Sequence, residues 1–205
     1  MKVDFIDKMG SDLSVVNAAR VSFAKRKEVL DEKDDKLIKY LAHWGHWSPF
    51  AHATMSFRIK APIFVARQLV KHQVGLSWNE VSRRYVDDDP EFYMIDEWRS
   101  RPKKSIKQGS GDKLIKFDIT HAVDTAKGTY HYMLEEGIAP EMARMILPQN
   151  MMTEWIWSGS VYAFSRVCNL RTKSNAQKET GSVAEQMASI MREHFPLCSK
   201  YLLDK

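Results

Sequence analysis

The chain has 205 residues, of which 44% are hydrophobic and 28% are charged, a composition typical of a soluble globular protein. Because domains usually hold about 100–200 residues, we expect a single domain over residues 1–205. There are 31 Lys and Arg against 26 Asp and Glu, and the net charge of +5 favours an anionic partner. The sequence has only two cysteines, Cys168 and Cys198, which excludes a disulfide framework and a cysteine-based zinc motif.

The longest apolar runs, such as Ala61–Ala66, are far shorter than the ~20 residues that a membrane span needs. The first residues carry charges where a signal peptide has its apolar core. We therefore expect a cytoplasmic protein with no membrane segment and with reduced cysteines.

The N-terminal part of the chain shows helix and strand periodicity in turn. From Leu37, apolar residues recur at i, i+3, i+4 and i+7, which predicts an amphipathic helix ended by Gly45. Apolar and polar residues alternate after residue 53, which predicts a half-buried strand. The expected elements are strand Val3–Ile6, helix Asp12–Arg20, helix Asp31–Trp44, strand Ala53–Lys60 and a helix from Pro62 to about His72.

The C-terminal part is richer in helix. Ser100–Asp112 has no periodicity and several charges, so we expect a surface loop there. The elements expected after it are helix Asp112–Glu136, helix Pro140–Leu147, strand Met151–Trp157, helix Val161–Leu170 and helix Ala176–Phe195. This pattern predicts an α/β (α+β) fold, a helix-rich single domain around a small, mostly antiparallel sheet. The aromatic strand at Trp155 and Trp157 is expected in the core.

Three stretches concentrate polar side chains among apolar ones. Gly45–His52 joins a helix to a strand, where loops often carry binding groups; the alternative is that His46 and His52 are only surface or capping histidines. Arg67–Tyr85 is rich in Ser, Asn, Gln and Arg, which fix hydrogen-bond geometry, and its Arg pair can clamp a phosphate beside Ser82. A solvated loop is the alternative. Gly137–Gln177 contains Arg144, Arg166 and Arg171 and nearby amides including that of Asn169. These side chains would form a basic pocket if the fold brings them together.

Several chemistries are not supported by the sequence. There is no Walker-type phosphate loop, no dinucleotide-binding glycine motif and no GxSxG elbow. To act as nucleophiles, Ser77 and Ser82 would each need a general base. His46 or His72 could be that base only through a tertiary contact. Neither cysteine lies in an evident Cys–His arrangement, which disfavours thiolate catalysis.

Five ordered blocks resemble the flavin-dependent thymidylate synthase family. The third is similar to the family's RHRxxSxNxxSxRY signature, with one extra residue before the first Ser. The blocks are AARVSF (Ala18–Phe23), GHWSPFAH (Gly45–His52), KHQVGLSWNEVSRRY (Lys71–Tyr85), GIAPEMARMILP (Gly137–Pro148) and NLRTKSNAQKE (Asn169–Glu179).

The resemblance implies a homotetramer that binds FAD at its subunit interfaces and methylates dUMP to dTMP with NADPH and methylenetetrahydrofolate. It implies a catalytic role for Arg171, which matches the arginine that polarises the uracil ring. The positions that match flavin contacts are His46, Ser48, Lys71, His72, Gln73, Asn79, Glu80, Ser160, Tyr162 and Arg166. Those that match nucleotide contacts are Gln68, Lys71, Ser82, Arg83, Arg84, Arg144 and Arg171.

The departures from the family pattern fall mainly on the flavin positions. The usual RHR reads Lys71-His72-Gln73, which loses two guanidinium groups and gains one ammonium group that cannot fork onto two oxygens. Ala51 stands where the family has Glu, and Ser160 and Tyr162 where it has Asn and Arg.

Two alternatives to the enzyme remain. A relative that binds nucleotide but has lost flavin is one. A nucleic-acid-binding module is the other, favoured by the basic charge and six Trp but opposed by the acidic stretches Asp31–Asp35 and Asp87–Asp89. We expect no nucleic-acid partner.

Overall fold

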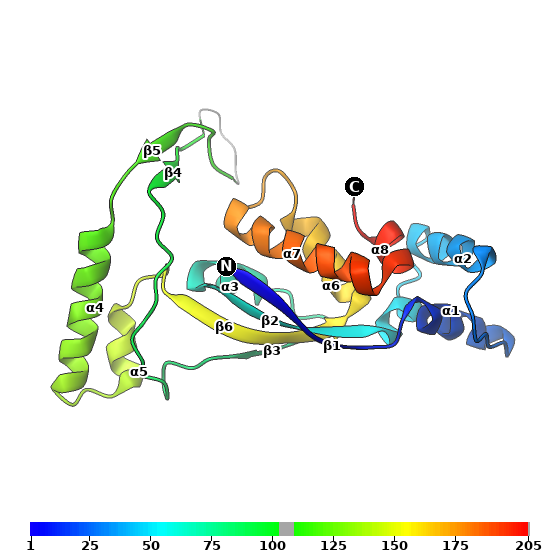
Figure 1. Ribbon diagram of the computed structural model, residues 1–205, viewed down its shortest axis with the longest axis horizontal. Coiled ribbons are helices and arrows are strands. Elements are labelled where there is room, and N and C mark those ends of the chain that lie inside the picture. The colour runs from blue at the N-terminus through cyan, green and yellow to red at the C-terminus, as the bar shows by residue number, and fades with distance from the viewer. Residues whose placement is uncertain (103–108, 205) are drawn as a thin grey trace.

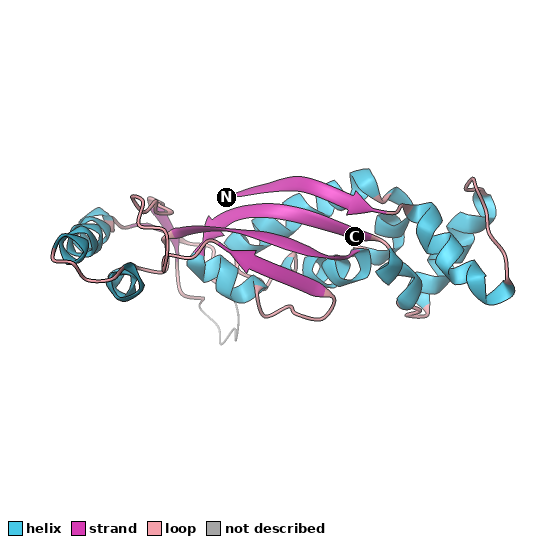
Figure 2. Cartoon of the chain, turned by 90° about the horizontal axis from the view of Figure 1, so that it is seen from below, coloured by secondary structure: helices cyan, strands magenta, loops and turns pink. Residues whose placement is uncertain are grey.

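A four-stranded antiparallel sheet forms the centre of the computed structural model, which describes residues 1–102 and 109–204. The strands lie in the order β1-β2-β6-β3, with bounds β1 Lys2–Met9, β2 Thr54–Pro62, β6 Met152–Ser160 and β3 Leu76–Glu80. Helices cover one face of this sheet, while the other face is open (Figures 1 and 2). This confirms the predicted mixture of helices with a small antiparallel sheet.

The helices form two groups (Figure 1). On or beside the sheet lie α1 Asp12–Arg20, α2 Glu32–His43, α3 Ile63–Leu69, α6 Val161–Arg171, α7 Lys178–His194 and α8 Pro196–Leu202, with the 3-10 turns η1 Val21–Phe23 and η2 Ser48–His52. An arm beyond one end of the sheet contains α4 Thr120–Glu135, α5 Pro140–Ala143, the 3-10 turn η3 Arg144–Ile146 and a hairpin of β4 Glu97–Arg99 and β5 Leu114–Lys116. None of the described helices has the length and apolar character needed to cross a membrane.

The alternating pattern of β2 determines which face of the sheet is covered. Phe57 and Ile59 are fully buried and pair in register with Trp157 and Trp155 of β6. Trp78 of β3 stacks on Trp155 with ring centroids 4.4 Å apart. The prediction that the aromatic strand belongs to the core is confirmed. On the opposite face β2 carries the polar side chains of Thr54, Ser56, Arg58 and Lys60, as the pattern of residues 54–60 predicted.

Several predicted elements agree closely with the structure. Helix Asp12–Arg20 has the predicted bounds, and α2 matches the prediction to within one residue at each end. The Asp31 side chain caps α2 by accepting from the amides of Lys33 and Asp34. Gly45 follows with a φ of +67°, the left-handed conformation that ends helices.

The predicted helix over Asp112–Glu136 is wrong in its first part. Residues 114–116 form β5, paired with β4, and α4 begins only at Thr120, whose amide donates to Asp118. Helix periodicity carries no information about a partner strand 17 residues away. Of the predicted loop Ser100–Asp112, residues 103–108 lie outside the described part. Its described ends continue the hairpin, because the Gly111 amide donates to the Ser100 carbonyl.

Besides the β4–β5 hairpin and the short 3-10 turns, two elements were not predicted, and both depend on distant partners. The polar segment Leu76–Glu80 is a strand because it pairs with β6. Helix α8 begins at Pro196, directly after the predicted helix ends at Phe195, and its first amides are capped by a residue far away in the sequence. The Asp12 carboxylate accepts from the amides of Leu197 and Cys198 at 3.0 and 2.9 Å.

A buried carboxylate holds α1 against α2. Asp34 is fully buried and accepts from Arg20 at 2.7 Å, from the Asp31 amide at 2.9 Å and from the Lys27 ammonium. Burial alone would raise the pKa of Asp34, but the hydrogen bonds from Lys27, the Asp31 amide and Arg20 outweigh it and lower the pKa to about 2. The folded state therefore stabilises the ionised form of Asp34.

We predict that Asp34→Asn lowers the free energy of unfolding by roughly 2 kcal/mol at neutral pH, because it leaves the partly buried cations of Arg20 and Lys27 without their counter-charge. Since the folded pKa is depressed, the stabilisation is present above about pH 4 and is lost as the pH falls toward 2. Urea denaturation at several pH values measures this difference. Glu32→Gln, which alters an exposed acid in the same helix, is the control. A constant difference between wild type and Asp34→Asn from pH 7 to pH 2 would contradict the prediction.

Candidate active site

The arginine predicted to be catalytic lies at the C-terminal end of α6, where α6 meets the turn that follows α3. Arg171 Nε donates to His72 Nε2 at 3.0 Å, and Arg171 Nη2 donates to the backbone carbonyl of Gln68 at 3.0 Å. The fold therefore brings three predicted site residues into contact across about 100 positions of sequence. A guanidinium has five N–H donors, so these bonds leave three for a ligand.

His72 is a neutral acceptor in this cluster. Partial burial lowers its pKa, and the positive charges of Arg171 and Arg166 lower it further. The hydrogen bond from Arg171 requires a free electron pair on Nε2, so the ring proton is on Nδ1. Burial also lowers the pKa of Arg171, but a guanidinium stays protonated in proteins. The site thus presents a fixed positive charge supported by an uncharged imidazole.

The Gln68 side chain joins this cluster to the start of α7. Its amide nitrogen donates to the side-chain oxygen Oε1 of Gln177, and its own side-chain oxygen accepts from the Thr180 hydroxyl at 3.2 Å. Gln177 is the N-cap residue of α7. Gln68 therefore contacts α7 through its side chain and Arg171 through its backbone.

A cleft of about 560 Å³ lies beside Gln68, between α3, the start of α7 and the β4–β5 hairpin. This is within the usual range for small-molecule sites. Aromatic rings and cations line much of it, namely Phe64, Tyr93, Trp98, Arg67, Lys71 and Arg99. Arg171 lines an adjoining pocket that shares Gln177 with this cleft. Such a lining suits a flat ring that carries anionic groups.

A second group of predicted residues surrounds the N-terminus of α6. The Ser160 hydroxyl caps α6 by accepting from the Ala163 amide at 3.1 Å, and the Ser160 amide donates to the Gly75 carbonyl. Gly75 has a φ of +78°, and a Cβ there would come within 3.2 Å of the Ala163 side chain. The turn that contains Gln73 is therefore held close to α6.

The Gly45–His52 segment reaches this same helix end. The Trp47 ring lies 6.3 Å from the Tyr162 ring, so the exposed His46 and Ser48 lie near the start of α6. Arg166, one turn further along α6, is close enough to His72 for its charge to lower the pKa of that histidine. Six flavin-matching positions thus lie on or near the N-terminal half of α6. They are His46, Ser48, Gln73, Ser160, Tyr162 and Arg166.

Asn79 and Glu80 lie further along β3. Glu80 accepts from the Thr153 hydroxyl at 2.7 Å and from the Trp78 indole at 3.1 Å, so the sheet fixes its carboxylate. Asn79 pairs with Ile156 in the register. Neither makes a described hydrogen bond to the α6 surface.

The remaining nucleotide-matching positions lie near the arm. Arg84 and Arg144 both approach Glu141: Arg84 Nε is 3.9 Å from its carboxylate, and Arg144 Nε donates to its carbonyl at 3.3 Å. The Ser82 hydroxyl accepts from the Arg84 amide, and Arg83 donates to the Asp88 carbonyl. Within the described chain, no hydrogen bond or ion pair joins this group to Arg171. Within one chain, the predicted nucleotide residues therefore lie in two separate groups.

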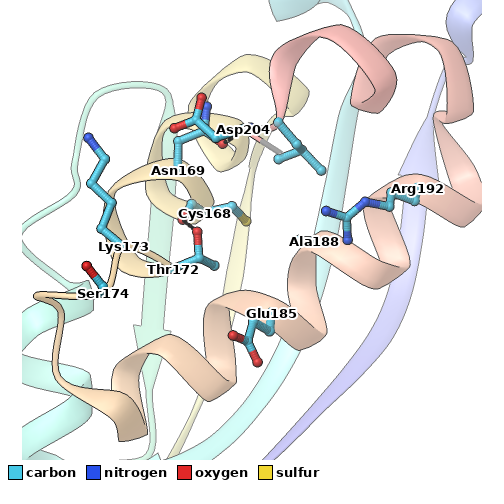
Figure 3. Close-up of a pocket in the computed structure, with 10 residues that line it drawn as sticks. Cys168, Asn169, Thr172, Lys173, Ser174, Glu185, Ala188, Arg192 and Asp204 are labelled. Atoms are coloured by element: carbon cyan, nitrogen blue, oxygen red, sulfur yellow. Dashed lines mark hydrogen bonds between the residues drawn. The ribbon is translucent and has the colours of Figure 1, made fainter.

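The predicted basic pocket around Arg144, Arg166 and Arg171 is not formed as one site, and Asn169 has a structural role. Its side chain donates to the Leu202 carbonyl and accepts from the Asp204 amide, which fixes the C-terminal segment. Figure 3 shows the pocket of about 510 Å³ that lies there, with Glu185 and Arg192 of α7 opposite α6. This pocket contains none of the residues predicted to bind flavin or nucleotide.

The cysteines are buried as free thiols. Burial raises the pKa of Cys168 to about 12, and burial together with Asp12 raises that of Cys198. Both thiols are protonated at neutral pH, in agreement with the prediction against thiolate chemistry.

Sequence reasoning missed Tyr93, Arg99 and Glu179 as parts of the cleft. Arg99 lies just before the segment predicted to be a loop, and Glu179 ends the fifth block without an assigned role. Glu179 is only 7% exposed and accepts hydrogen bonds from an arginine 80 positions away. Such a contact leaves no local signal in the sequence.

Three comparisons with known proteins agree with one another. Residues 4–197 match the family model described as thymidylate synthase complementing protein. The flavin-dependent thymidylate synthase of Thermotoga neapolitana is 40% identical over 200 residues, covering 95% of this chain and 87% of that protein. That of Thermus thermophilus is 38% identical over 199 residues, covering 95% and 73%.

Among solved structures, a UMP/dUMP methylase, PolB of Streptomyces cacaoi bound with 5-Br dUMP, aligns with a TM-score of 0.87 and 31% identity. The alignment covers 100% of this chain and 97% of that one. The family match over most of the length confirms what the five blocks predicted: the chain belongs to the thymidylate synthase complementing protein family.

Proposed function

We propose that the chain is a flavin-dependent thymidylate synthase, which methylates dUMP to dTMP using FAD, methylenetetrahydrofolate as carbon donor and NADPH as reductant. The observation that carries this proposal is the Arg171–His72–Gln68 cluster beside a cleft lined by cations and aromatic rings. Residues 1–205 act as one domain in the cytoplasm.

Arg171 stabilises negative charge on the uracil ring. Hydride addition at C6 of uracil places negative charge on C5 and on the C4 carbonyl oxygen next to N3, and a guanidinium fixed beside that oxygen lowers the energy of that state. Because His72 and the Gln68 carbonyl already hold two of its donors, Arg171 needs little reorganisation when the nucleotide binds.

The residues around α6 suit a flavin. Lys71 and Arg166 are cations for its diphosphate, and the exposed Trp47 beside Tyr162 offers an aromatic surface. His46, Ser48, His72, Gln73 and Ser160 add hydrogen-bonding groups around the same surface, while Asn79 and Glu80 lie further along the sheet. When bound, FAD supplies the redox chemistry, and the protein supplies orientation and charge.

The site is completed by a second subunit of a homotetramer. Ser82, Arg83, Arg84 and Arg144 bind the phosphate end of a nucleotide whose base lies near Gln68, Lys71 and Arg171 of another subunit. Large apolar side chains next to both groups support this proposal. Val74 is 80% exposed, Tyr85 75% and Met145 69%, and exposed apolar surface of this kind marks contact sites.

A second candidate activity is methylation of UMP, which is favoured by the structural match to a protein described as a UMP/dUMP methylase. We predict that the enzyme methylates UMP as well as dUMP, with kcat/KM measured for each nucleotide under identical conditions. Activity with dUMP alone would restrict the chain to thymidylate synthesis.

We predict that the purified protein is yellow and that its visible absorbance bleaches when NADPH is added without oxygen, because FAD is bound and reduced. Formation of dTMP from dUMP and methylenetetrahydrofolate, followed by chromatography, completes the test. A colourless protein that FAD cannot reconstitute, yet that binds oligonucleotides with steep salt dependence, would instead support a nucleic-acid-binding module.

We predict that Arg171→Ala retains flavin but loses dTMP formation by about 100-fold or more, the usual effect of removing one preorganised donor. Flavin absorbance and kcat are measured on the same preparation. Arg192→Ala, which alters an exposed arginine of α7 in the pocket of Figure 3, is the matched control. Turnover of Arg171→Ala close to wild type would show that Arg171 does not have this role.

A further inference from the structure

A largely buried ion pair lies in the wall of the cleft beside Gln68. Arg99 Nη2 donates to both carboxylate oxygens of Glu179 at 2.7 Å, and its Nε donates to the Ser110 hydroxyl at 2.8 Å. Only 7% of the Glu179 side chain and 21% of the Arg99 side chain are exposed. The bonds from Arg99 overcome the effect of burial and lower the pKa of Glu179, so the pair is charged.

On one side, this pair acts on the residues that hold the nucleotide cluster. Glu179 lies in the first turn of α7, between Gln177 and Thr180. Both of these neighbours hydrogen-bond to the Gln68 side chain, and the Gln68 carbonyl accepts from Arg171. A shift of the first turn of α7 would therefore move Gln68 and, through it, Arg171.

On the other side, the pair holds the hairpin. Arg99 is the last residue of β4, and the strands β4 and β5 have three residues each. A two-stranded ribbon this short is marginally stable by itself, so its place depends on contacts with the rest of the protein. Trp98, Arg99 and Ser110 form the side of the cleft opposite α3. The ion pair is a charged contact that joins this side of the cleft to α7.

We propose that Arg99 and Glu179 are positioning residues of the nucleotide cleft. Their ion pair keeps the hairpin in place as the outer wall and fixes the first turn of α7, which orients Gln68 and supports Arg171. Neither residue touches the reacting atoms. The inference rests on the proposed function, because it takes the cleft beside Gln68 as the place of the nucleotide.

The test measures KM for dUMP, kcat and flavin content in Arg99→Met, in Glu179→Gln and in the double variant. We expect KM to rise about 10-fold or more in each single variant and more than kcat falls, with flavin absorbance unchanged. Each single variant leaves one group without its counter-charge, whereas the double variant leaves neither. We therefore expect the double variant to be no worse than the more impaired single variant, a coupling that independent sites would not show.

Conservative and control variants sharpen the test. Arg99→Lys keeps the charge but not the three-bond geometry, so its KM should lie between those of wild type and Arg99→Met. Lys200→Met removes the ion pair between α8 and Asp35 of α2, far from the cleft, and should leave KM within twofold of wild type. If Arg99→Met does not fold, Glu179→Gln still tests the proposal because it preserves shape and one acceptor.

Binding of dUMP separates this inference from the proposed function. The dissociation constant is measured for wild type and Glu179→Gln from the dUMP-dependent shift in melting temperature. A wild type that binds dUMP but forms no dTMP would count against the proposed function alone. Equal dissociation constants and equal KM values in wild type, Arg99→Met and Glu179→Gln would overturn the positioning role.

Discussion

The antiparallel pairing of β2 with β6 is the constraint on which the rest of the molecule depends. The two strands pair from Thr54 opposite Ser160 to Pro62 opposite Met152. Because they run in opposite directions, α3 begins at one end of the pair and α6 at the other, each directly after its strand. The two helices therefore run toward each other over the same face. This is why His72, just after α3, meets Arg171 at the end of α6.

Charge distribution explains how such a site stays ready for an anionic ligand. Arg171 is held by groups that carry no charge, the neutral His72 ring and the Gln68 carbonyl, so its own charge is not cancelled. Arg99, by contrast, is neutralised by Glu179 and serves to hold the cleft wall. The two arginines thus differ in the partners of their guanidinium groups, which are uncharged for Arg171 and a carboxylate for Arg99. The net charge of +5 is consistent with the small anionic ligands proposed for this site.

Hydrophobic periodicity predicted those elements whose own residues carry a clear pattern. Helix Asp12–Arg20 and the alternating strand after Ala53 follow from periodicity, since each buries one face of its own. The strand Leu76–Glu80 and helix α8 could not be predicted in this way. The first needs β6 as its partner, and the second is capped by Asp12, more than 180 positions away. The prediction of a helix from Asp112 missed strand β5 for the same reason, because β5 needs β4 as its partner.

The sequence by itself determined the family, because five ordered blocks of specific residues are a pattern that chance does not produce. It also determined which side chains are candidates for the chemistry, with Arg171 foremost among them. Only the tertiary structure decided which candidates lie together: Arg171 with His72 and Gln68, apart from Arg84 and Arg144. It alone revealed Arg99 and Glu179, which meet across 80 positions. The physical reason is that contacts between distant segments depend on strand register and helix packing. Neither of these can be read from the spacing of residues within one segment.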